Sequence, residues 1–246
     1  VYAKAGQQDR PTFAGRRVCV ISNSYADSRP QTIVWGPDGA LWFPENRGNK
    51  IGRITPSGRI TEYAVATPES YPFGIAPGPD RALWFTMSGT GRIGRITASG
   101  EMSEFALRTT QSPYGIAAGP DGNLWFTGFN SNTVGRITPL GEVSEFSVPT
   151  PDSAPHNIVA GPDGALWFTQ TTSDSVGRIT TEGRLSAFPL PTTGGQPYGI
   201  VASAEGADDH GAGLGRSGGR LFGEGRTARG GQRDGGDEHK THIRSL

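Results

Sequence analysis

A sequence block that opens with Gly-Pro-Asp and contains Leu-Trp-Phe occurs four times in this chain. The copies begin at Gly36, Gly78, Gly119 and Gly161, and their tryptophans (Trp42, Trp84, Trp125 and Trp167) are 42, 41 and 42 residues apart. A spacing this constant means that the central part of the chain, about residues 31–200, repeats one structural unit.

Each unit is predicted to form four short β-strands. In the third unit the candidate strands are residues 114–119, 123–127, 134–138 and 142–148. Residues 120–122 (Pro-Asp-Gly) make a turn, because proline fixes φ and Asp and Gly suit the later turn positions. Strand-length apolar runs broken by Gly and Pro disfavour helical repeats. A single four-stranded unit cannot bury both of its faces, so we expect an all-β fold, a β-propeller with about four complete blades recognisable here.

The bulk composition narrows the function classes. The chain has 23 Lys and Arg against 23 Asp and Glu, and zero net charge argues against broad binding to nucleic acids or anionic membranes. No apolar run approaches the roughly 20 residues of a membrane-spanning helix, and the N-terminal residues lack the apolar core of a secretory signal. The single Cys19 cannot form an internal disulfide. We therefore expect a cytoplasmic protein that binds neither nucleic acid nor membrane.

The repeat breaks inside its fifth unit. That unit starts correctly with residues 196–202, but no Gly-Pro-Asp block follows, and 12 of the last 44 residues are glycine. Two interpretations of residues 203–246 stay open: a disordered Gly/Arg/Asp-rich tail, or the product of a reading-frame shift in a GC-rich gene. Residues 1–25 are also unlike the repeat and form an N-terminal segment of uncertain nature. The predicted propeller repeats span residues 26–202.

The repeat pattern resembles that of the streptogramin B (virginiamycin B) lyase family. The shared motifs are Gly-Pro-Asp-Gly-x-Leu-Trp-Phe-Thr, (Ile/Val)-Gly-Arg-Ile-Thr and (Ser/Thr)-Glu-Phe, and they cover about residues 31–200. Gluconolactonase-like and NHL-repeat propellers share the Gly-Asp-Gly turns but less of the Ile-Gly-Arg-Ile-Thr strand. The resemblance implies a seven-bladed ring, of which this chain shows four full units and the start of a fifth.

The resemblance also implies an enzyme. Lyases of this family linearise cyclic depsipeptide antibiotics by elimination at an ester bond, with Mg²⁺ and without water, which gives antibiotic resistance. Elimination needs a base for the proton alpha to a carbonyl and an acid for the leaving oxygen, and histidine suits both tasks near neutral pH. Mg²⁺ would stabilise the developing enolate. The implied partner is a small cyclic peptide-like molecule, and a complete ring is expected to be monomeric.

The family's catalytic residues carry over to one position. A family histidine lies in a Pro-His-x-Ile junction, which His156 matches. The next family junction, Glu-Pro-His-Gly-Ile, has Gln196 and Tyr198 here in place of Glu and His. A second family glutamate would fall in the stretch replaced by the tail. His156 is therefore the candidate catalytic residue, and the ligands for the implied Mg²⁺ are not found in this chain.

The other units have an aromatic residue at the position of His156, namely Phe73, Tyr114 and Tyr198. These three are candidate substrate-binding residues, because aromatic side chains could stack on an aromatic peptide antibiotic. Packing between blades is an equally good account of them. By the same comparison, His156 is either a channel-lining base or a polar variant of the aromatic position.

The matching arginines of the four units are expected to pair with acidic residues across strands rather than to act in catalysis. The arginines are Arg53, Arg95, Arg136 and Arg178, and the acids are Glu62, Glu104 and Glu145. The repeated tryptophans are expected to fill the core between blades.

Some acidic and histidine side chains outside these sets could hold a metal ion. Glu45 stands where the family often has glutamate, but one carboxylate makes no Mg²⁺ site, and a solvated acid at a strand end is the expected role. Weak metal binding by the tail is a second option. The tail residues concerned are His210, Asp237, Glu238, His239 and His242.

Three functions are compatible with these observations. The first is a streptogramin B lyase, and the second is a propeller that binds a ligand without chemistry, because fold does not settle function. The third is an inactive truncated product, which the broken repeat favours. A cluster of one glutamate with two histidines would distinguish the first from the others, and the sequence supplies only His156.

Resequencing the gene across the codons for residues 199–217 is expected to reveal a single-base error. The corrected frame should restore a Gly-Pro-Asp-Gly-x-Leu-Trp-Phe-Thr strand and, later, a Glu-Pro-His-Gly-Ile junction. If the printed frame is confirmed, the frame-shift interpretation is wrong and the catalytic set is incomplete in this chain.

Overall fold

Sixteen β-strands in four separate antiparallel sheets make up the computed structural model, which describes residues 28–202. Each sheet contains four strands that pair in chain order. The first sheet consists of β1 (Val34–Trp35), β2 (Leu41–Glu45), β3 (Lys50–Ile54) and β4 (Ile60–Ala64), and the second of β5 (Pro72–Pro77), β6 (Leu83–Met87), β7 (Arg92–Ile96) and β8 (Met102–Ala106). The third consists of β9 (Pro113–Ala118), β10 (Leu124–Gly128), β11 (Thr133–Ile137) and β12 (Val143–Ser147), and the fourth of β13 (Pro155–Ala160), β14 (Leu166–Gln170), β15 (Ser175–Ile179) and β16 (Leu185–Pro189).

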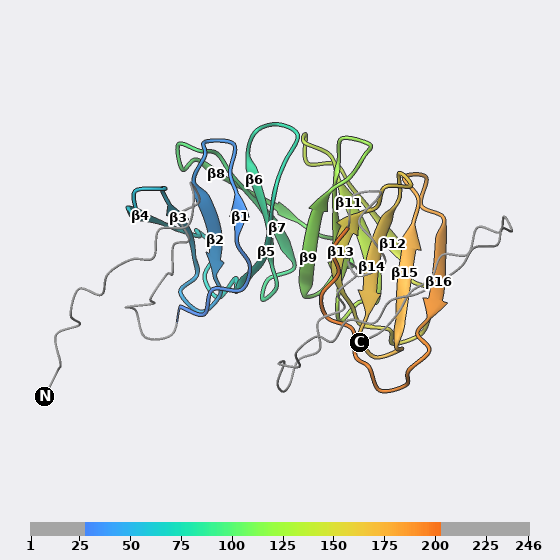
Figure 1. The fold of residues 1–246 in the computed structure, drawn as a ribbon. Helices are drawn as coiled ribbons and strands as arrows, with labels where there is room; N and C mark the ends of the chain where they lie inside the picture. Colours follow the sequence, from blue (N-terminus) through green and yellow to red (C-terminus); the bar gives the residue numbers. More distant parts are fainter. Residues whose placement is uncertain (1–27, 203–246) are drawn as a thin grey trace, which may run out of the picture.

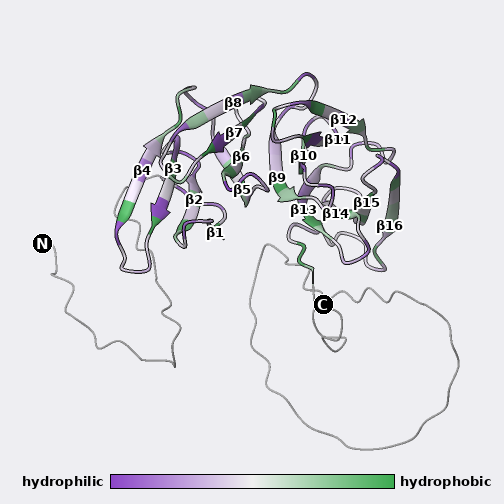
Figure 2. Cartoon of the chain, turned by 90° about the horizontal axis from the view of Figure 1, so that it is seen from above, coloured by the Kyte–Doolittle hydropathy of each residue, from purple (hydrophilic) through white to green (hydrophobic). Residues whose placement is uncertain are grey.

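The four sheets stand side by side as the blades of an arc (Figures 1 and 2). Strands β1, β5, β9 and β13 lie on the concave side, and β4, β8, β12 and β16 lie on the convex side (Figure 2). The predicted all-β propeller with four complete blades is confirmed. Among residues 28–202 no helix is long and apolar enough to cross a membrane. Residues 1–25 and 203–246, which include the tail histidines, lie outside the described residues. The interpretations of these two segments therefore stay predictions.

A phenylalanine of the second strand packs against a glycine of the third strand in every blade. In the second blade Phe85 and Gly94 are cross-strand partners, and a Cβ on Gly94 would lie 2.1 Å from the Phe85 ring. The other pairs are Phe43 with Gly52, Phe126 with Gly135 and Phe168 with Gly177. The repeated Ile-Gly-Arg-Ile motif therefore contains glycine because the ring occupies the space of its side chain.

Three of the four repeated tryptophans lie between the blades, as predicted, whereas Trp167 of the fourth blade is only partly buried. Trp42, Trp84 and Trp125 have 0% of their surface exposed, and each stacks on the aromatic residue of its own outer strand, at 5.4–5.8 Å between ring centroids. Those partners are Tyr63, Phe105 and Phe146. Large aromatic side chains bury much apolar area, so these stacks supply a large part of the core between blades.

The arginines pair with the aspartate of the first turn, so the predicted pairing with glutamates is wrong. In the second blade the Arg95 Nε is 2.6 Å from Asp80 Oδ2, and the Trp84 Nε1 donates to Asp80 Oδ1 at 3.0 Å. Arg53 with Asp38 and Arg178 with Asp163 repeat the ion pair at 2.7 Å. The arginine lies directly across from the tryptophan in the register, which places it beside the turn that the tryptophan holds.

The third blade breaks this pattern for a local reason. Asn123 occupies the position of an alanine in the other blades, and its Nδ2 donates to Asp121 Oδ2 at 2.8 Å. Arg136 instead donates to the backbone oxygen of Thr181 in the fourth blade, at 3.2 Å. Because the Asn123 amide binds this oxygen of Asp121, Arg136 binds the neighbouring blade instead.

Two of the predicted glutamate partners instead bind the segments that connect the blades. Glu145 accepts hydrogen bonds from Thr109 and Thr110, and Glu104 accepts from the Thr67 backbone N–H at 3.2 Å. Burial by itself would raise the pKa of Glu145, but the hydrogen bonds from Thr110 and Thr109 outweigh it and hold the pKa below its usual value. Glu62 binds Lys50 at 2.6 Å.

The replacement Gly94→Ala is expected to destabilise the protein by about 1–3 kcal/mol, because a methyl group must displace the Phe85 ring from a packed core. The matched control is Gly195→Ala, where the nearest atom to the added Cβ lies 3.6 Å away. The free energy of unfolding from urea titration measures both. Equal effects of the two replacements would contradict the packing role of the glycine.

Candidate functional site

The inner strands β5, β9 and β13, and the segment that begins the fifth unit, each start with a proline that follows a residue with positive φ. The φ angles are 46° at Tyr71, 51° at Ser112, 48° at Ala154 and 42° at Gln196. Residues other than glycine rarely adopt this conformation, and such positions often lie near functional sites. The residue after each proline is the one predicted to line the channel: Phe73, Tyr114, His156 and Tyr198.

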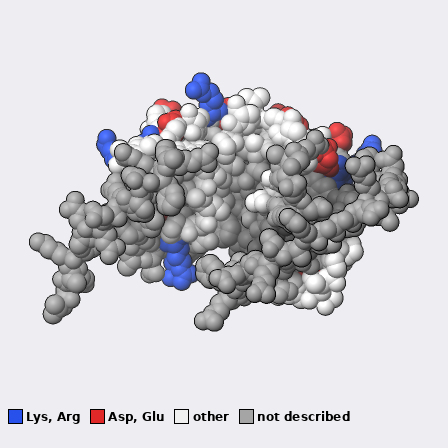
Figure 3. Space-filling view, in the orientation of Figure 1, with Lys and Arg blue, Asp and Glu red and all other residues white. Residues whose placement is uncertain are grey.

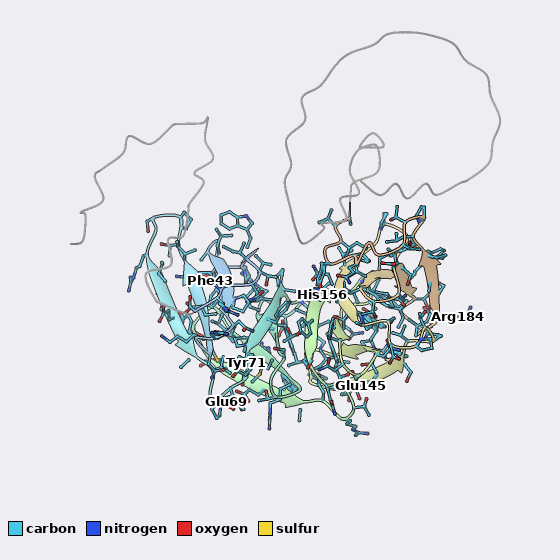
Figure 4. All side chains as sticks on the ribbon, turned by 90° about the horizontal axis from the view of Figure 1, so that it is seen from below. Phe43, Glu69, Tyr71, Glu145, His156 and Arg184 are labelled. Carbon is cyan, nitrogen blue, oxygen red and sulfur yellow. The ribbon has the colours of Figure 1, made fainter. Side chains whose placement is uncertain are left out.

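The structure brings these four side chains together on the concave side. His156 lies 5.2 Å from Tyr114, 5.0 Å from Tyr198 and 5.7 Å from Phe73, measured between ring centroids. Phe73 and Tyr114 are also in edge contact at 4.4 Å. Figure 4 shows His156 at the inner strands, away from the outer rim of the arc.

A fifth ring, Phe129, joins the cluster and was missed by the sequence reasoning. It follows β10 and lies 4.9 Å from Tyr114 and 6.0 Å from His156. The equivalent residues in the other blades, Asn46, Ser88 and Thr171, are polar, so an aromatic residue at this one position was the available signal. Phe73, Tyr114, Phe129, His156 and Tyr198 are referred to below as the inner aromatic cluster.

The environment of His156 favours its neutral form. The ring is half-buried, and its Nδ1 atom is buried with no hydrogen-bond partner among the described residues. Burial lowers the pKa of His156 below its ordinary value of 6.5, and the backbone of Tyr198 opposes this shift only in part. A neutral imidazole near pH 7 is able to accept a proton, which a general base requires.

The described residues do not fit a Mg²⁺ site. Within residues 28–202 no group of three or more His, Cys, Asp or Glu side chains is placed to hold a metal ion. The rings around His156 are aromatic, whereas Mg²⁺ prefers carboxylate and other oxygen ligands. The implied Mg²⁺ therefore stays a prediction.

Glu45 differs from its expected role as a solvated acid at a strand end. It is only 5% exposed, and burial followed by the nearby Glu62 raises its pKa, against the opposing charge of Lys50. The corresponding residues of the other blades, Met87, Gly128 and Gln170, are also buried, so burial is common to this position of the repeat. Strand geometry, rather than polarity, decides the exposure of the side chain here.

Charges of both signs are interspersed on the visible part of the described surface (Figure 3). This distribution agrees with the balanced composition and gives that face no extended basic area for a polyanion.

Comparison with known proteins identifies the family. The model of the virginiamycin B lyase family matches residues 12–207. The chain belongs to this family. Its members among solved structures include the virginiamycin B lyase from Staphylococcus aureus, with 43% sequence identity and a TM-score of 0.72 over 74% of this chain and 62% of that chain. A second, a streptogramin B lyase, is 38% identical with a TM-score of 0.71, over 74% of this chain and 61% of that one.

The match to the virginiamycin B lyases is partial in length. The chain spans about three fifths of the two lyase structures. A virginiamycin B lyase from Bordetella parapertussis is 38% identical over 48 residues, which are 18% of this chain and 16% of that protein. The hydrazine synthase of Kuenenia stuttgartiensis, 22% identical with a TM-score of 0.57 over 70% of this chain and 53% of that chain, shares the fold alone.

The replacement His156→Phe is expected to remove one component of the pH dependence of stability. The folded protein binds a proton at His156 less readily than the unfolded chain, so stability falls as pH drops from about 6.5 through the lowered pKa of the folded state. Urea titrations at about pH 8 and about pH 5.5 measure this loss. The variant should lose less stability between the two pH values, and an equal loss in both proteins would rule out the titration of His156 as its source.

Proposed function

We propose that this protein is a streptogramin B lyase-type enzyme that holds a cyclic depsipeptide against the inner aromatic cluster and transfers a proton through His156. The single observation that carries the proposal is the meeting of His156 with four aromatic rings on the concave side of the arc. Family membership adds support, because a catalytically inactive histidine-to-alanine variant of the Staphylococcus aureus virginiamycin B lyase has been solved with quinupristin.

The proposed chemistry is elimination. A base removes the proton alpha to the carbonyl of the residue that carries the ester oxygen, and the electron pair forms a carbon–carbon double bond. The carbon–oxygen bond of the ester breaks at the same residue, and the acyl oxygen leaves as a carboxylate. The ring opens without gaining water, so the linear product has the mass of the cyclic substrate.

The residues described here contribute the base and the binding surface. His156 is neutral near pH 7 because burial lowers its pKa, so it can accept the alpha proton. Phe73, Tyr114, Phe129 and Tyr198 offer ring faces and edges to aromatic groups of a peptide. The ligands of the predicted Mg²⁺ would have to come from outside residues 28–202, which contain no group of three or more metal-ligating side chains.

The second candidate function is binding without catalysis. The specific observation in its favour is that the ring contacts of His156 are all aromatic, and that no carboxylate or second histidine acts on it among the described residues. A propeller with this cluster could hold an aromatic cyclic peptide and release it unchanged.

Incubation of the full chain with quinupristin, with and without Mg²⁺, tests the proposal. Mass spectrometry and chromatography should show a linear product of unchanged mass, while hydrolysis would add one water. His156→Phe should abolish conversion but retain binding measured by calorimetry, because the ring is kept and the base is lost. Binding without conversion by the unaltered chain would favour the second candidate, and the absence of both would refute the two together.

A further inference from the structure

A continuous series of hydrogen bonds joins the inner strands through threonine hydroxyls. In blades two to four, the threonine of the second strand accepts an N–H from its own inner strand and donates to a carbonyl near the start of the following unit. In chain order the bonds are Thr32 Oγ1 to Phe73 O (3.2 Å), Gly74 N to Thr86 Oγ1 (2.8 Å), Thr86 Oγ1 to Tyr114 O (2.8 Å), Gly115 N to Thr127 Oγ1 (2.9 Å), Thr127 Oγ1 to His156 O (2.6 Å), Asn157 N to Thr169 Oγ1 (3.1 Å) and Thr169 Oγ1 to Tyr198 O (3.1 Å). We call this series the threonine belt.

The first blade keeps the belt with a different residue. Pro44 replaces the threonine of the second strand there and has no hydroxyl group. Thr32, which stands at the position of Gly74 and Gly115 in the next two blades, donates to Phe73 O instead. A bond that survives the loss of its usual donor is a requirement of the structure rather than a by-product of the repeated sequence.

Every carbonyl that the belt binds belongs to a member of the inner aromatic cluster. The peptide unit between His156 and Asn157 is held at both ends, since its oxygen accepts from Thr127 and its N–H donates to Thr169. The Thr127 bond to His156 is the shortest of the series, at 2.6 Å. Gly115 makes this approach possible, because a Cβ there would lie only 2.6 Å from the His156 oxygen.

The threonines of the belt are buried. Thr86, Thr127 and Thr169 have 0% of their surface exposed. Hydroxyl and peptide groups alternate and all donate in the same direction, so each bond polarises the next. A buried hydroxyl or peptide group that lost its partner would remain unsatisfied, at a cost of about 1–3 kcal/mol.

We propose that Thr127 and Thr169 are positioning residues for His156, which fix the direction of the imidazole by clamping the peptide unit that follows it. The proposal rests on the proposed function and deepens it, because it names the residues that hold the proposed base in place. Thr127 binds the backbone of His156 itself, and Thr169 binds both the next N–H and the Tyr198 carbonyl beside the ring.

The imidazole should respond to the loss of either threonine. Among the described residues, the titratable side chains in ring contact with His156 are Tyr114 and Tyr198, and its other ring neighbours are Phe73 and Phe129. A ring released from its buried position gains solvent, so its pKa moves up toward the ordinary value. A misplaced base also slows catalysis, by up to about a hundredfold for a displacement near 1 Å.

The test is an NMR titration of the His156 ring in the full chain, with the signal assigned by its absence in His156→Phe. The variants are Thr127→Val and Thr169→Val. The matched control is Thr133→Val, which removes a buried hydroxyl of the third blade that bonds Thr110 and Ser131 and no inner strand. Thr127→Ser keeps a hydroxyl and should restore the wild-type titration. We expect both valine variants at positions 127 and 169 to raise the His156 pKa, with the serine variant and Thr133→Val close to wild type.

Turnover of quinupristin gives a second readout. If the chain is a lyase, Thr127→Val should lower kcat by about tenfold or more with KM nearly unchanged, because the base rather than the binding surface is displaced. If the chain lacks turnover, the proposed function fails while the titration still tests the positioning role. Should Thr127→Val not fold, Thr169→Val with Thr169→Ser provides the same comparison. A His156 pKa that moves no further in these variants than in Thr133→Val would overturn the proposal.

Discussion

The packing of one blade face against the next is the interaction on which the rest of this structure depends. Each four-stranded sheet has two faces, and neither is covered by its own strands. The outer-strand aromatic residue of one blade lies under a turn glycine of the following blade, where a Cβ would come within 2.3 Å of the ring. The three contacts are Tyr63 with Gly100, Phe105 with Gly141 and Phe146 with Gly183. At the ends of the arc this contact is missing: Phe188 is 39% exposed, and the Cβ position of Gly58 meets nothing within 4 Å.

Blade packing and the candidate site depend on consecutive residues of the same second strands. The tryptophan and phenylalanine of the second strand fix one blade on the next, and the threonine that follows them carries the threonine belt to the inner strands. The threonine belt already holds the backbone of the residue that follows the junction proline. The side chain at this position can therefore differ from blade to blade. This explains how one position can carry Phe73, Tyr114, His156 or Tyr198 with little change of the main chain around it.

The sequence-based predictions that were wrong failed for local physical reasons. The predicted partners of the arginines were the glutamates one strand away, but the turn aspartate, already bound to the tryptophan, is nearer to the guanidinium. Burial by itself would raise the pKa of Asp80, but the hydrogen bonds from Trp84 and Arg95 outweigh it and keep the carboxylate charged. Glu45 was expected in solvent because of its charge, although its place on the strand directs it to the core. Phe129 was missed because it lies in a loop whose counterparts are polar.

The sequence by itself determined the repeat, its strands, the all-β propeller and the family, because glycine, proline and aromatic residues recur at positions where a blade has no steric alternative. It also pointed to His156, Phe73, Tyr114 and Tyr198 as one recurring position. Only the tertiary structure decided that these side chains meet, that Phe129 joins them, and that Thr127 and Thr169 hold the peptide unit after His156. The reason is that these contacts join different strands, and most of them join different blades, so their distances depend on how the strands and blades are placed rather than on any local pattern.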